Sequence, residues 1–233
     1  MDKSYIEKVR ELEKRIGYEF ENFDLLIMAL RHSSYVNEHH MDRIVCNERL
    51  EFLGDAVLEC VSSEYLYQQF PMKPEGELTK LRASLVCEPT LAYDAREIQL
   101  GEYLVMGKGE EMTGGRARDS ITSDAFESVI GAIFLDGGFA NAKEFILNHV
   151  LDDVEHKRFF YDSKTILQEV LQEKQEAVIS YRITDEAGPD HDKTFTAEVC
   201  LGGTCLGKGQ GRTKKAAEQQ AAYDALCRIK QKK

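Results

Sequence analysis

The sequence has no apolar run long enough to cross a membrane. Near its middle the longest run extends from Val129 to Leu135 and ends at Asp136, whereas a membrane-spanning helix needs about 20 apolar residues. Residues 1–17 are charged, show helical spacing of their apolar side chains and lack the apolar stretch of a signal peptide. These absences predict a cytoplasmic protein that has no membrane partner.

Sequence signals for zinc binding and for nucleophilic catalysis are missing as well. The six cysteines form no C-x-x-C pair and lie within apolar patterns, so we predict reduced core residues and no zinc site. The six histidines form no H-E-x-x-H motif and no Ser/His/Asp order that indicates a hydrolase triad. Isolated histidines of this kind are typical of surface or core positions.

Net positive charge is also lacking, although the charge is unevenly distributed. The chain of 233 residues has a formal net charge of -11, which by itself argues against nucleic acid as a partner. Residues 1–162 contain 18 Lys and Arg against 31 Asp and Glu, whereas residues 163–233 contain 12 against 10. An acidic part that holds metal and a more basic part that holds a polyanion fit these counts, provided that the basic charges share one face.

The pattern of apolar residues changes near residue 161 and predicts two domains of different class. From Ser4 to about Leu151 the spacing is helical, and Gly, Pro and Asn/Asp turns interrupt it. The expected helices cover residues 5–16, 25–30, 47–70, 78–87, 89–98 and 123–136, and a turn-rich loop covers residues 106–120. We therefore predict an all-α domain at residues 1–158, followed by a linker at residues 159–162.

Residues 163–233 predict a small α+β domain. A helix over residues 164–173, with Ser163 as its cap, precedes two strands of alternating apolar residues. A short third strand is expected to end at the glycine run of residues 207–211, and an alanine-rich helix follows over residues 213–229. The order α-β-β-β-α allows both helices to pack on one face of an antiparallel sheet.

Residues 47–58 predict a helix with a carboxylate face. Spacings of three and seven residues place Glu48, Glu51 and Asp55 on one side. The opposite side is an apolar stripe that consists of Leu50, Leu53, Val57, Cys60 and Val61. Clustered carboxylates destabilise a helix unless they are neutralised, for which a hard divalent cation is suited. The alternative is a solvated charged face, which is common on helices.

A second helix, over residues 123–136, supplies further carboxylates. Asp124 and Glu127 share one face, Gly131 leaves that face free of bulk one turn later, and the other side is anchored by Phe126, Val129 and Ile133. Carboxylates from two facing helices form an all-oxygen site for Mg²⁺ or Mn²⁺. Hydrolysis of a phosphodiester uses such a site, with two ions roughly 3.5 to 4 Å apart. A di-iron centre would need Glu-x-x-His motifs, which neither helix contains.

These motifs resemble the bacterial ribonuclease III family over nearly the whole chain. Residues 47–58 are similar to the family's signature helix, and the motifs Gly-Lys-Gly-Glu-Glu, Gly-Gly-Arg-x-Arg and Asp-x-x-Glu follow within residues 107–127. Ser123 and Cys46 depart from the family's common Ala and His, but neither is an acid. The resemblance implies a homodimeric, metal-dependent endonuclease of double-stranded RNA. It would cut both strands, leave 5′-phosphate and 3′-hydroxyl ends with a short 3′ overhang, and process structured precursors of rRNA and of some mRNA and tRNA.

The resemblance also implies roles for individual acids. Carried over by position, the residues that would coordinate Mg²⁺, or Mn²⁺ in its place, are Glu51, Asp55, Asp124 and Glu127. Asp55 and Glu127 would be catalytic, with Glu127 in the centre. Glu48 and Glu75 match acidic positions that the family places near substrate or a second metal. A duplex-binding protein that does not cut is the alternative, but the acids on both helices argue against it.

The second domain resembles a double-stranded-RNA-binding domain at three places. The residues concerned are Thr165, Gln168 and Glu169 on the first helix, His191 in the loop of residues 188–191, and Thr213, Lys214 and Lys215 at the start of the last helix. Positive side chains at the N-terminus of the last helix add to the positive end of its dipole and can lie along RNA phosphates. The first helix and the loop of residues 188–191 would contact the flanking minor grooves of the RNA. The alternative for the two lysines is a solubilising helix start.

Three further side chains have two interpretations each. Arg116 and Arg118 either reach RNA phosphates beside the metal site or are ordinary loop charges. Phe52 belongs to neither the acidic nor the apolar side of its helix, and burial of a Phe is worth about 1.5–3 kcal/mol, so an exposed one usually has a partner. The resemblance suggests that the partner is a second subunit, and a place in the core is the alternative.

Overall fold

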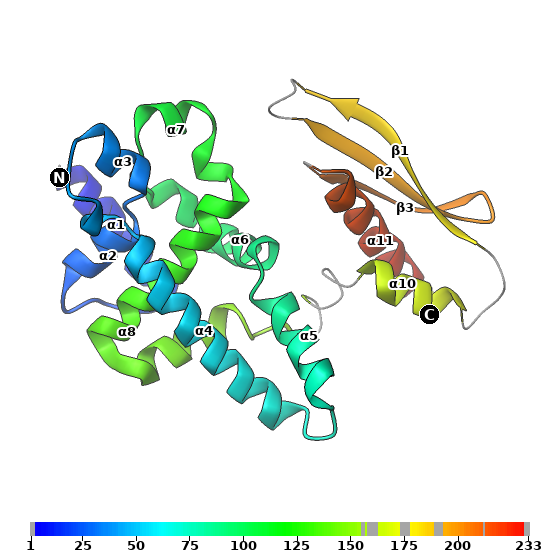
Figure 1. Cartoon of the computed structure of the whole chain (residues 1–233), viewed down its shortest axis with the longest axis horizontal. Helices are drawn as coiled ribbons and strands as arrows, with labels where there is room; N and C mark the ends of the chain where they lie inside the picture. Colours follow the sequence, from blue (N-terminus) through cyan, green and yellow to red (C-terminus); the bar gives the residue numbers. More distant parts are fainter. Residues whose placement is uncertain are drawn as a thin grey trace. The chain divides into compact units, whose positions relative to one another are not determined.

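The computed structural model describes residues 3–154, 157, 163–172, 178–188, 193–211 and 213–230. The chain forms two compact units, Met1–Val154 and Glu155–Lys233, and each is considered by itself below (Figure 1). The predicted linker at residues 159–162 lies outside the described residues, so that boundary stays a prediction.

The first unit is all-helical, as predicted. Its elements are α1 (Lys3–Ile16), α2 (Phe23–Ala29), α3 (Ser33–Glu38), η1 (Arg43–Val45), α4 (Glu48–Gln69), α5 (Glu75–Leu85), α6 (Glu88–Glu97), η2 (Leu100–Tyr103), α7 (Lys108–Met112), η3 (Gly115–Ala117) and α8 (Asp119–His149). The predicted helices are all present. The expected loop at residues 106–120 contains α7 and η3, and α3 was not predicted, because helices of five or six residues show too little periodicity.

The longest helix, α8, runs through the core of this unit beside α4 (Figure 1). The predicted anchors Phe126, Val129 and Ile133 are fully buried. The helix does not end at Asp136, as expected, but bends at Gly138, whose φ of 77° is outside the helical region, and continues to His149. The Asp136 carboxylate accepts hydrogen bonds from the Tyr18 hydroxyl (2.8 Å) and from the backbone N–H of Asn22 (2.7 Å), which ties the segment between α1 and α2 to the bend.

The buried side of α4 is displaced from the predicted stripe. Leu50, Val57 and Val61 are buried as expected, but Leu53 is only half-buried and Cys60 is exposed. Leu58 occupies the buried position instead. The prediction that all six cysteines are core residues is therefore wrong for Cys60, which lies at the edge of the stripe. It is also wrong for the exposed Cys205 in the second unit.

The second unit has the predicted order of elements. These are α10 (Ser163–Gln172), β1 (Ile179–Ala187), β2 (Thr194–Leu201), β3 (Thr204–Gly211) and α11 (Lys214–Lys230). The strands form an antiparallel sheet in the order β1-β2-β3, and α10 and α11 pack together, with α11 lying against β2 and β3 (Figure 1). The core of this unit consists of Leu167, Leu171, Ala197, Val199, Ala217, Ala221, Ala222, Ala225 and Leu226. Ser163 is the first residue of α10, and its hydroxyl donates to the Gln219 carbonyl of α11 (2.8 Å).

The glycine run lies within β3, which ends with it at Gly211, so the strand is longer than the short one predicted. A methyl group added at Gly207 or Gly209 would overlap the backbone of α11 at Ala221. The alternate glycines therefore let the alanine-rich side of α11 approach the sheet at backbone distance. Glycine is present here for close packing, which a strand prediction from alternating apolar residues does not detect.

Candidate active site

Helices α4 and α8 touch backbone to backbone where they cross. A methyl group at Gly54 would overlap the carbonyl oxygen of Glu127, and one at Gly131 would overlap the carbonyl oxygen of Leu50. The sequence pattern suggested that Gly131 keeps the acidic face free of bulk, and the structure shows that the α4 backbone takes that space. The Ser128 hydroxyl, with the Asn47 carbonyl 3.1 Å away, adds a polar contact at the crossing. Two glycines thus determine how close the acids of the two helices can lie.

The predicted acids of both helices gather at this crossing. Burial, reinforced by the negative charges of Asp55, Glu51 and Asp124, raises the pKa of Glu127 to about 8. Burial, followed by the charges of Asp124, Glu48 and Asp55, raises the pKa of Glu51 to about 7. The structure therefore brings together Glu51, Asp55, Asp124 and Glu127 as one electrostatically coupled group, named below the four-acid cluster.

The two aspartates of the four-acid cluster are shifted in the same direction. Burial raises the pKa of Asp55, and the charge of Glu59 adds to this, while Arg82 opposes it. Burial also raises the pKa of Asp124, against a hydrogen bond from the Ser123 hydroxyl and the charge of His32. The surroundings of each carboxylate therefore disfavour its ionised form, and a bound cation would favour it.

His32 is a residue beside the cluster that the sequence did not indicate. It is half-buried, and burial lowers its pKa, against the charges of Glu110, Asp124 and Glu48. Its Nδ1 accepts the backbone N–H of Ser34 (3.3 Å), so the neutral ring carries its proton on Nε2. No spacing rule links His32 to Asp124, because the contact depends on how the chain folds between them.

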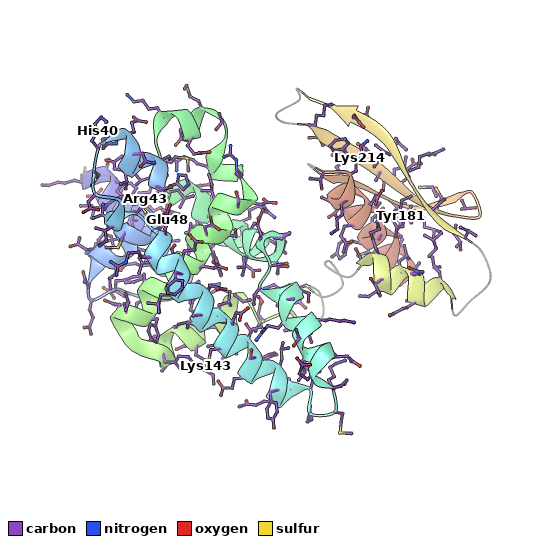
Figure 2. All side chains as sticks on the ribbon, viewed as in Figure 1. His40, Arg43, Glu48, Lys143, Tyr181 and Lys214 are labelled. Carbon is purple, nitrogen blue, oxygen red and sulfur yellow. The ribbon has the colours of Figure 1, made fainter. Side chains whose placement is uncertain are left out.

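Glu48 differs from the four-acid cluster because it already has a counter-ion. Arg43 Nη2 lies 3.1 Å from Glu48 Oε1, and Figure 2 shows the two side chains together at the start of α4. The hydrogen bond from Arg43 holds the pKa of the Glu48 carboxyl below its usual value. Of the three acids on this face of α4, Glu48 is therefore neutralised by an arginine five residues earlier, and its role near substrate or a second metal stays a prediction.

Glu75 lies in the first turn of α5, and not on α4 or α8. Its carboxylate accepts a hydrogen bond from the Thr79 hydroxyl one turn later (2.8 Å). This local contact neither joins Glu75 to the four-acid cluster nor excludes a role near substrate, so its functional role stays a prediction.

The four-acid cluster fits a hard divalent cation by its chemistry. It offers only carboxylate oxygens, which Mg²⁺ and Mn²⁺ prefer. Its raised pKa values show that burial and mutual repulsion outweigh the opposing charges of Arg82 and His32. Among the described residues, no three of these acids bring oxygen atoms within 4.8 Å of one another. A cation would therefore draw the side chains inward by rotation about their own bonds.

Arg116 and Arg118 make extensive contacts within the loop before α8. The Arg116 guanidinium donates to the carbonyl oxygens of Leu104 (2.6 Å) and Gly101 (3.1 Å) and pairs with Glu111. Arg118 pairs with Glu110 and lies 3.3 Å from the Thr113 hydroxyl. These contacts favour the interpretation of both arginines as residues that hold the loop, and Arg118 remains partly exposed.

The candidate RNA-contacting residues of the second unit lie at its surface. Thr165, Gln168 and Glu169 are exposed on α10, and Thr213 accepts the Ala216 N–H (3.1 Å) as the cap of α11. Lys214 Nζ lies 3.2 Å from Glu186 and over the Phe195 ring, and Figure 2 labels it at the start of α11. Lys215 is exposed beside it. His191 lies outside the described residues.

Comparison with known proteins assigns the first unit to a family. A family model described as Ribonuclease-III-like matches residues 22–154, which is more than half of the chain. The chain belongs to the ribonuclease III family. A second model, described as a double-stranded RNA binding motif, matches residues 163–229, so this family member carries an RNA-binding unit after its nuclease unit.

Curated relatives match the ribonuclease III chain over nearly its full length. Ribonuclease 3 of Desulforamulus reducens is 54% identical over 223 residues, which cover 94% of this chain and 91% of the relative. Ribonuclease 3 of Oceanobacillus iheyensis is 50% identical over 220 residues, covering 94% and 96% respectively.

A solved structure also resembles the nuclease unit of this ribonuclease III. It is the nuclease domain of ribonuclease III from Campylobacter jejuni, described for structural flexibility in a region involved in dimer formation. It matches with a TM-score of 0.58 and 44% identity, and covers 62% of this chain and 96% of that one. No described helix of this ribonuclease III is long and apolar enough to span a membrane.

The raised pKa values of the four-acid cluster predict how pH affects stability of the metal-free ribonuclease. Glu127 and Glu51 titrate near 8 and 7 in the folded chain but near 4.5 when unfolded, so the folded state binds more protons between these values. The stability that these two carboxyls contribute is then greatest below about pH 4.5, falls as pH rises towards about 7 to 8, and is lost above that range. We expect the melting temperature in EDTA to fall between about pH 5.5 and about pH 8.5, and Mg²⁺ to raise it more at the higher pH.

Calorimetry of the wild-type chain and of Glu127→Gln tests this expectation. The variant lacks the group with the larger shift, so its melting temperature in EDTA should fall less steeply with pH than that of the wild type. Parallel curves for the two proteins would contradict the assignment of the pH dependence to Glu127.

Proposed function

We propose that this family member, an endoribonuclease of double-stranded RNA, depends on Mg²⁺. The ion would be held by Glu51, Asp55, Asp124 and Glu127. The products would have 5′-phosphate and 3′-hydroxyl ends with a short 3′ overhang. The observation that carries the metal assignment is the coupling of four carboxylates, three of them half-buried (Glu51, Asp124 and Glu127) and one exposed (Asp55). Burial is the largest cause of the raised pKa of each, and it outweighs the opposing charges of Arg82 on Asp55 and of His32 on Asp124. Structured precursors of rRNA and of some mRNA and tRNA are the proposed substrates. Mn²⁺ has the same ligand preference and would substitute.

The bound ion would supply an activated water and neutralise charge on the phosphodiester. The residues of the chain do the rest. The crossing of α4 and α8 holds Glu51 and Asp55 against Asp124 and Glu127, so the site is positioned by helices and not by loops. Glu127 interacts with the other three members of the cluster, which favours it as the central ligand. Because Glu127 is largely protonated in the metal-free chain near neutral pH, loading of the site is expected to release a proton.

Cleavage of a labelled duplex by the purified chain tests the proposed function. We expect cutting in Mg²⁺ or Mn²⁺ and none in EDTA, while a single strand of the same sequence is left intact. Duplex binding in EDTA should persist, because the second unit holds the RNA-binding residues. Cutting that continues in EDTA would contradict the metal assignment, and binding without cutting in Mg²⁺ would favour the duplex-binding protein that does not cut.

We also propose that Lys214 and Lys215, at the start of α11 in the second unit, contact RNA phosphates. The N-terminus of α11 adds partial positive charge there, and Lys215 is exposed. Thr165, Gln168 and Glu169 on α10, and His191, are proposed to meet the flanking minor grooves. Both arginines are partly exposed, but Arg116 also donates to the carbonyl oxygens of Gly101 and Leu104, which leaves Arg118 as the better candidate of the two for an RNA contact.

Lys215→Gln is expected to weaken duplex binding about two- to tenfold and to lower the slope of log affinity against log salt by about one. A binding titration at several salt concentrations measures both. Lys80→Gln removes an exposed lysine from α5 in the nuclease unit and serves as the control. Equal losses in both variants would show a general charge effect and not a phosphate contact at α11.

We propose that the chain is a homodimer in which Phe52 enters a socket of a second subunit. Its side chain is 80% exposed on α4, on neither the acidic nor the buried side of the helix. The free energy of burying one Phe is about 1.5–3 kcal/mol, and a twofold dimer would bury two. This free energy of burial is gained only if Phe52 leaves the solvent, which favours a partner surface that covers it.

Phe52→Ala is accordingly expected to raise the dimer dissociation constant by at least about a hundredfold. Light scattering over a concentration series measures the mass. Tyr67→Ala is the matched control, because Tyr67 is also an exposed aromatic of α4 (75% exposed) near the other end of the helix. A mass that is unchanged in Phe52→Ala at low concentration would exclude the socket.

A further inference from the structure

Two cysteines face each other across strands β2 and β3. Cys200 and Cys205 are direct partners in the antiparallel register, and their sulfur atoms lie within 4.8 Å of one another. The strands are joined at Leu201 and Thr204 by a two-residue turn, Gly202 and Gly203, both with positive φ. In such a hairpin the pair next to the turn is hydrogen-bonded and the following pair is not. Cys200 and Cys205 are that following pair, and the register shifts by one residue directly beyond them, before the pair of Val199 with Gly207.

The backbone of such a pair suits a disulfide. Opposed residues in a non-hydrogen-bonded pair have Cα atoms about 4.5 Å apart, whereas disulfides join Cα atoms about 4.4–6.8 Å apart. Closure of the bond therefore needs side-chain rotation and no separation of the strands. The sequence did not indicate this pair, because its spacing is not C-x-x-C and the turn alone brings the two positions together.

The surroundings of the pair favour thiol chemistry over metal binding. Glu198 also offers an oxygen within 4.8 Å of both sulfur atoms, which makes a three-ligand group. Its carboxylate, however, is already held by Lys208 (2.6 Å) and Arg182 (2.8 Å), one on each oxygen. A divalent cation would have to displace or approach these two positive groups, whereas a disulfide adds no charge.

We propose that Cys200 and Cys205 are a modification site at which exchange with a low-molecular-weight disulfide forms a reversible intramolecular disulfide. Cys205 is exposed and reacts first, whereas Cys200 is buried beside it. The Cys205 sulfur attacks the small disulfide, forms a mixed disulfide and releases one thiol. The Cys200 sulfur then attacks the Cys205 sulfur and releases the second thiol. The protein loses two protons and two electrons, and the small disulfide is reduced to two thiols.

The site lies at the end of the sheet away from Lys214, one of the proposed RNA contacts. Phe195 pairs with Gly211 at one end of β2 and β3, where Lys214 pairs with Glu186, and the turn at Gly202 and Gly203 closes the other end (Figure 1). Oxidation is therefore expected to rigidify the glycine turn and to leave duplex affinity within about twofold. Lower backbone hydrogen exchange in residues 201–204 should accompany the disulfide.

Oxidised glutathione added to the reduced, full-length chain tests the proposal. Peptide mass spectrometry without reduction should show Cys200 linked to Cys205 and should show only a glutathione adduct on Cys60, an exposed cysteine without an opposed partner cysteine among the described residues. Reduced glutathione should reverse the linkage. In Cys200→Ser the expected product is a glutathione adduct on Cys205, and Cys60→Ser should form the Cys200–Cys205 linkage as the wild type does.

Two results would overturn the proposal. One is a wild-type chain in which Cys205 carries glutathione and no Cys200–Cys205 linkage forms at any ratio of oxidised to reduced glutathione. The other is stoichiometric Zn²⁺ binding by the reduced chain that blocks the exchange and is lost in Cys200→Ser and Glu198→Gln, which would make the group a metal site. Circular dichroism of each variant shows that the unit is still folded.

Discussion

Glu127→Gln is expected to lower the rate of duplex cleavage on the order of a thousandfold or more while leaving duplex affinity in EDTA unchanged. Glutamine keeps the shape of the side chain but removes the charge, and the proposed cation would lose its central ligand. The double-stranded RNA binding motif matches residues 163–229, in the other unit, and is not altered. Cleavage under single-turnover conditions and a binding titration in EDTA measure the two quantities separately.

The effect of Glu127→Gln on stability shows whether cleavage is lost because the carboxylate is missing or because the variant is misfolded. Burial, reinforced by the negative charges of Asp55, Glu51 and Asp124, raises the pKa of Glu127 to about 8, so near pH 8 its ionised form lowers the stability of the metal-free chain. Removal of one charge should therefore raise the melting temperature of the metal-free chain at that pH, by about 2–4 °C for each kcal/mol of repulsion relieved. A misfolded variant would melt at a lower temperature.

Glu144→Gln is the matched control for this experiment. Glu144 is an exposed residue of the same helix, beyond the bend at Gly138. Its replacement should change the rate less than about twofold, since surface substitutions away from special features have small effects. Retention of Mg²⁺-dependent cutting in Glu127→Gln at the rate of this control would refute the proposed role of Glu127.

Gly54→Ala is expected to destabilise the nuclease unit by about 1–3 kcal/mol and to abolish most of its cleavage activity. The added methyl group would overlap the carbonyl oxygen of Glu127, so α4 and α8 must move apart where they cross. Alanine is better than glycine in a helix by about 0.5–1 kcal/mol, which offsets only part of this cost. Separation of the helices also moves Glu51 and Asp55 away from Glu127, and the metal site is expected to widen.

Gly76→Ala is the control that distinguishes the overlap at Gly54 from the effect of alanine on helix propensity. Gly76 is also a helical glycine, on α5, but no atom lies within 4 Å of the position that its Cβ would take. We expect this variant to be as stable as the wild type or up to about 1 kcal/mol more stable, with normal cleavage. Urea denaturation measures the free energy of unfolding of both variants. Equal stabilities for Gly54→Ala and Gly76→Ala would show that the crossing is not constrained by glycine.

Local patterns along single elements were predictable from the sequence, whereas contacts between elements were not. The helical unit, the α-β-β-β-α unit and the faces that carry Glu51, Asp55, Asp124 and Glu127 follow from the spacing of side chains along single elements. The errors occurred where one element meets another. The glycines of β3 belong to the strand because α11 packs against them. The sequence also did not indicate that Arg43 from η1 pairs with Glu48.

The sequence by itself determined which acids lie on which helices, because periodicity depends only on positions along one helix. It also determined the family, since the motifs are read directly from the residues. Only the tertiary structure decided that Gly54 and Gly131 bring those helices into backbone contact, that His32 lies beside Asp124, and that Cys200 opposes Cys205 across a turn. These are distances between segments, and distances between segments depend on packing, turns and burial, which no pattern within a single segment records.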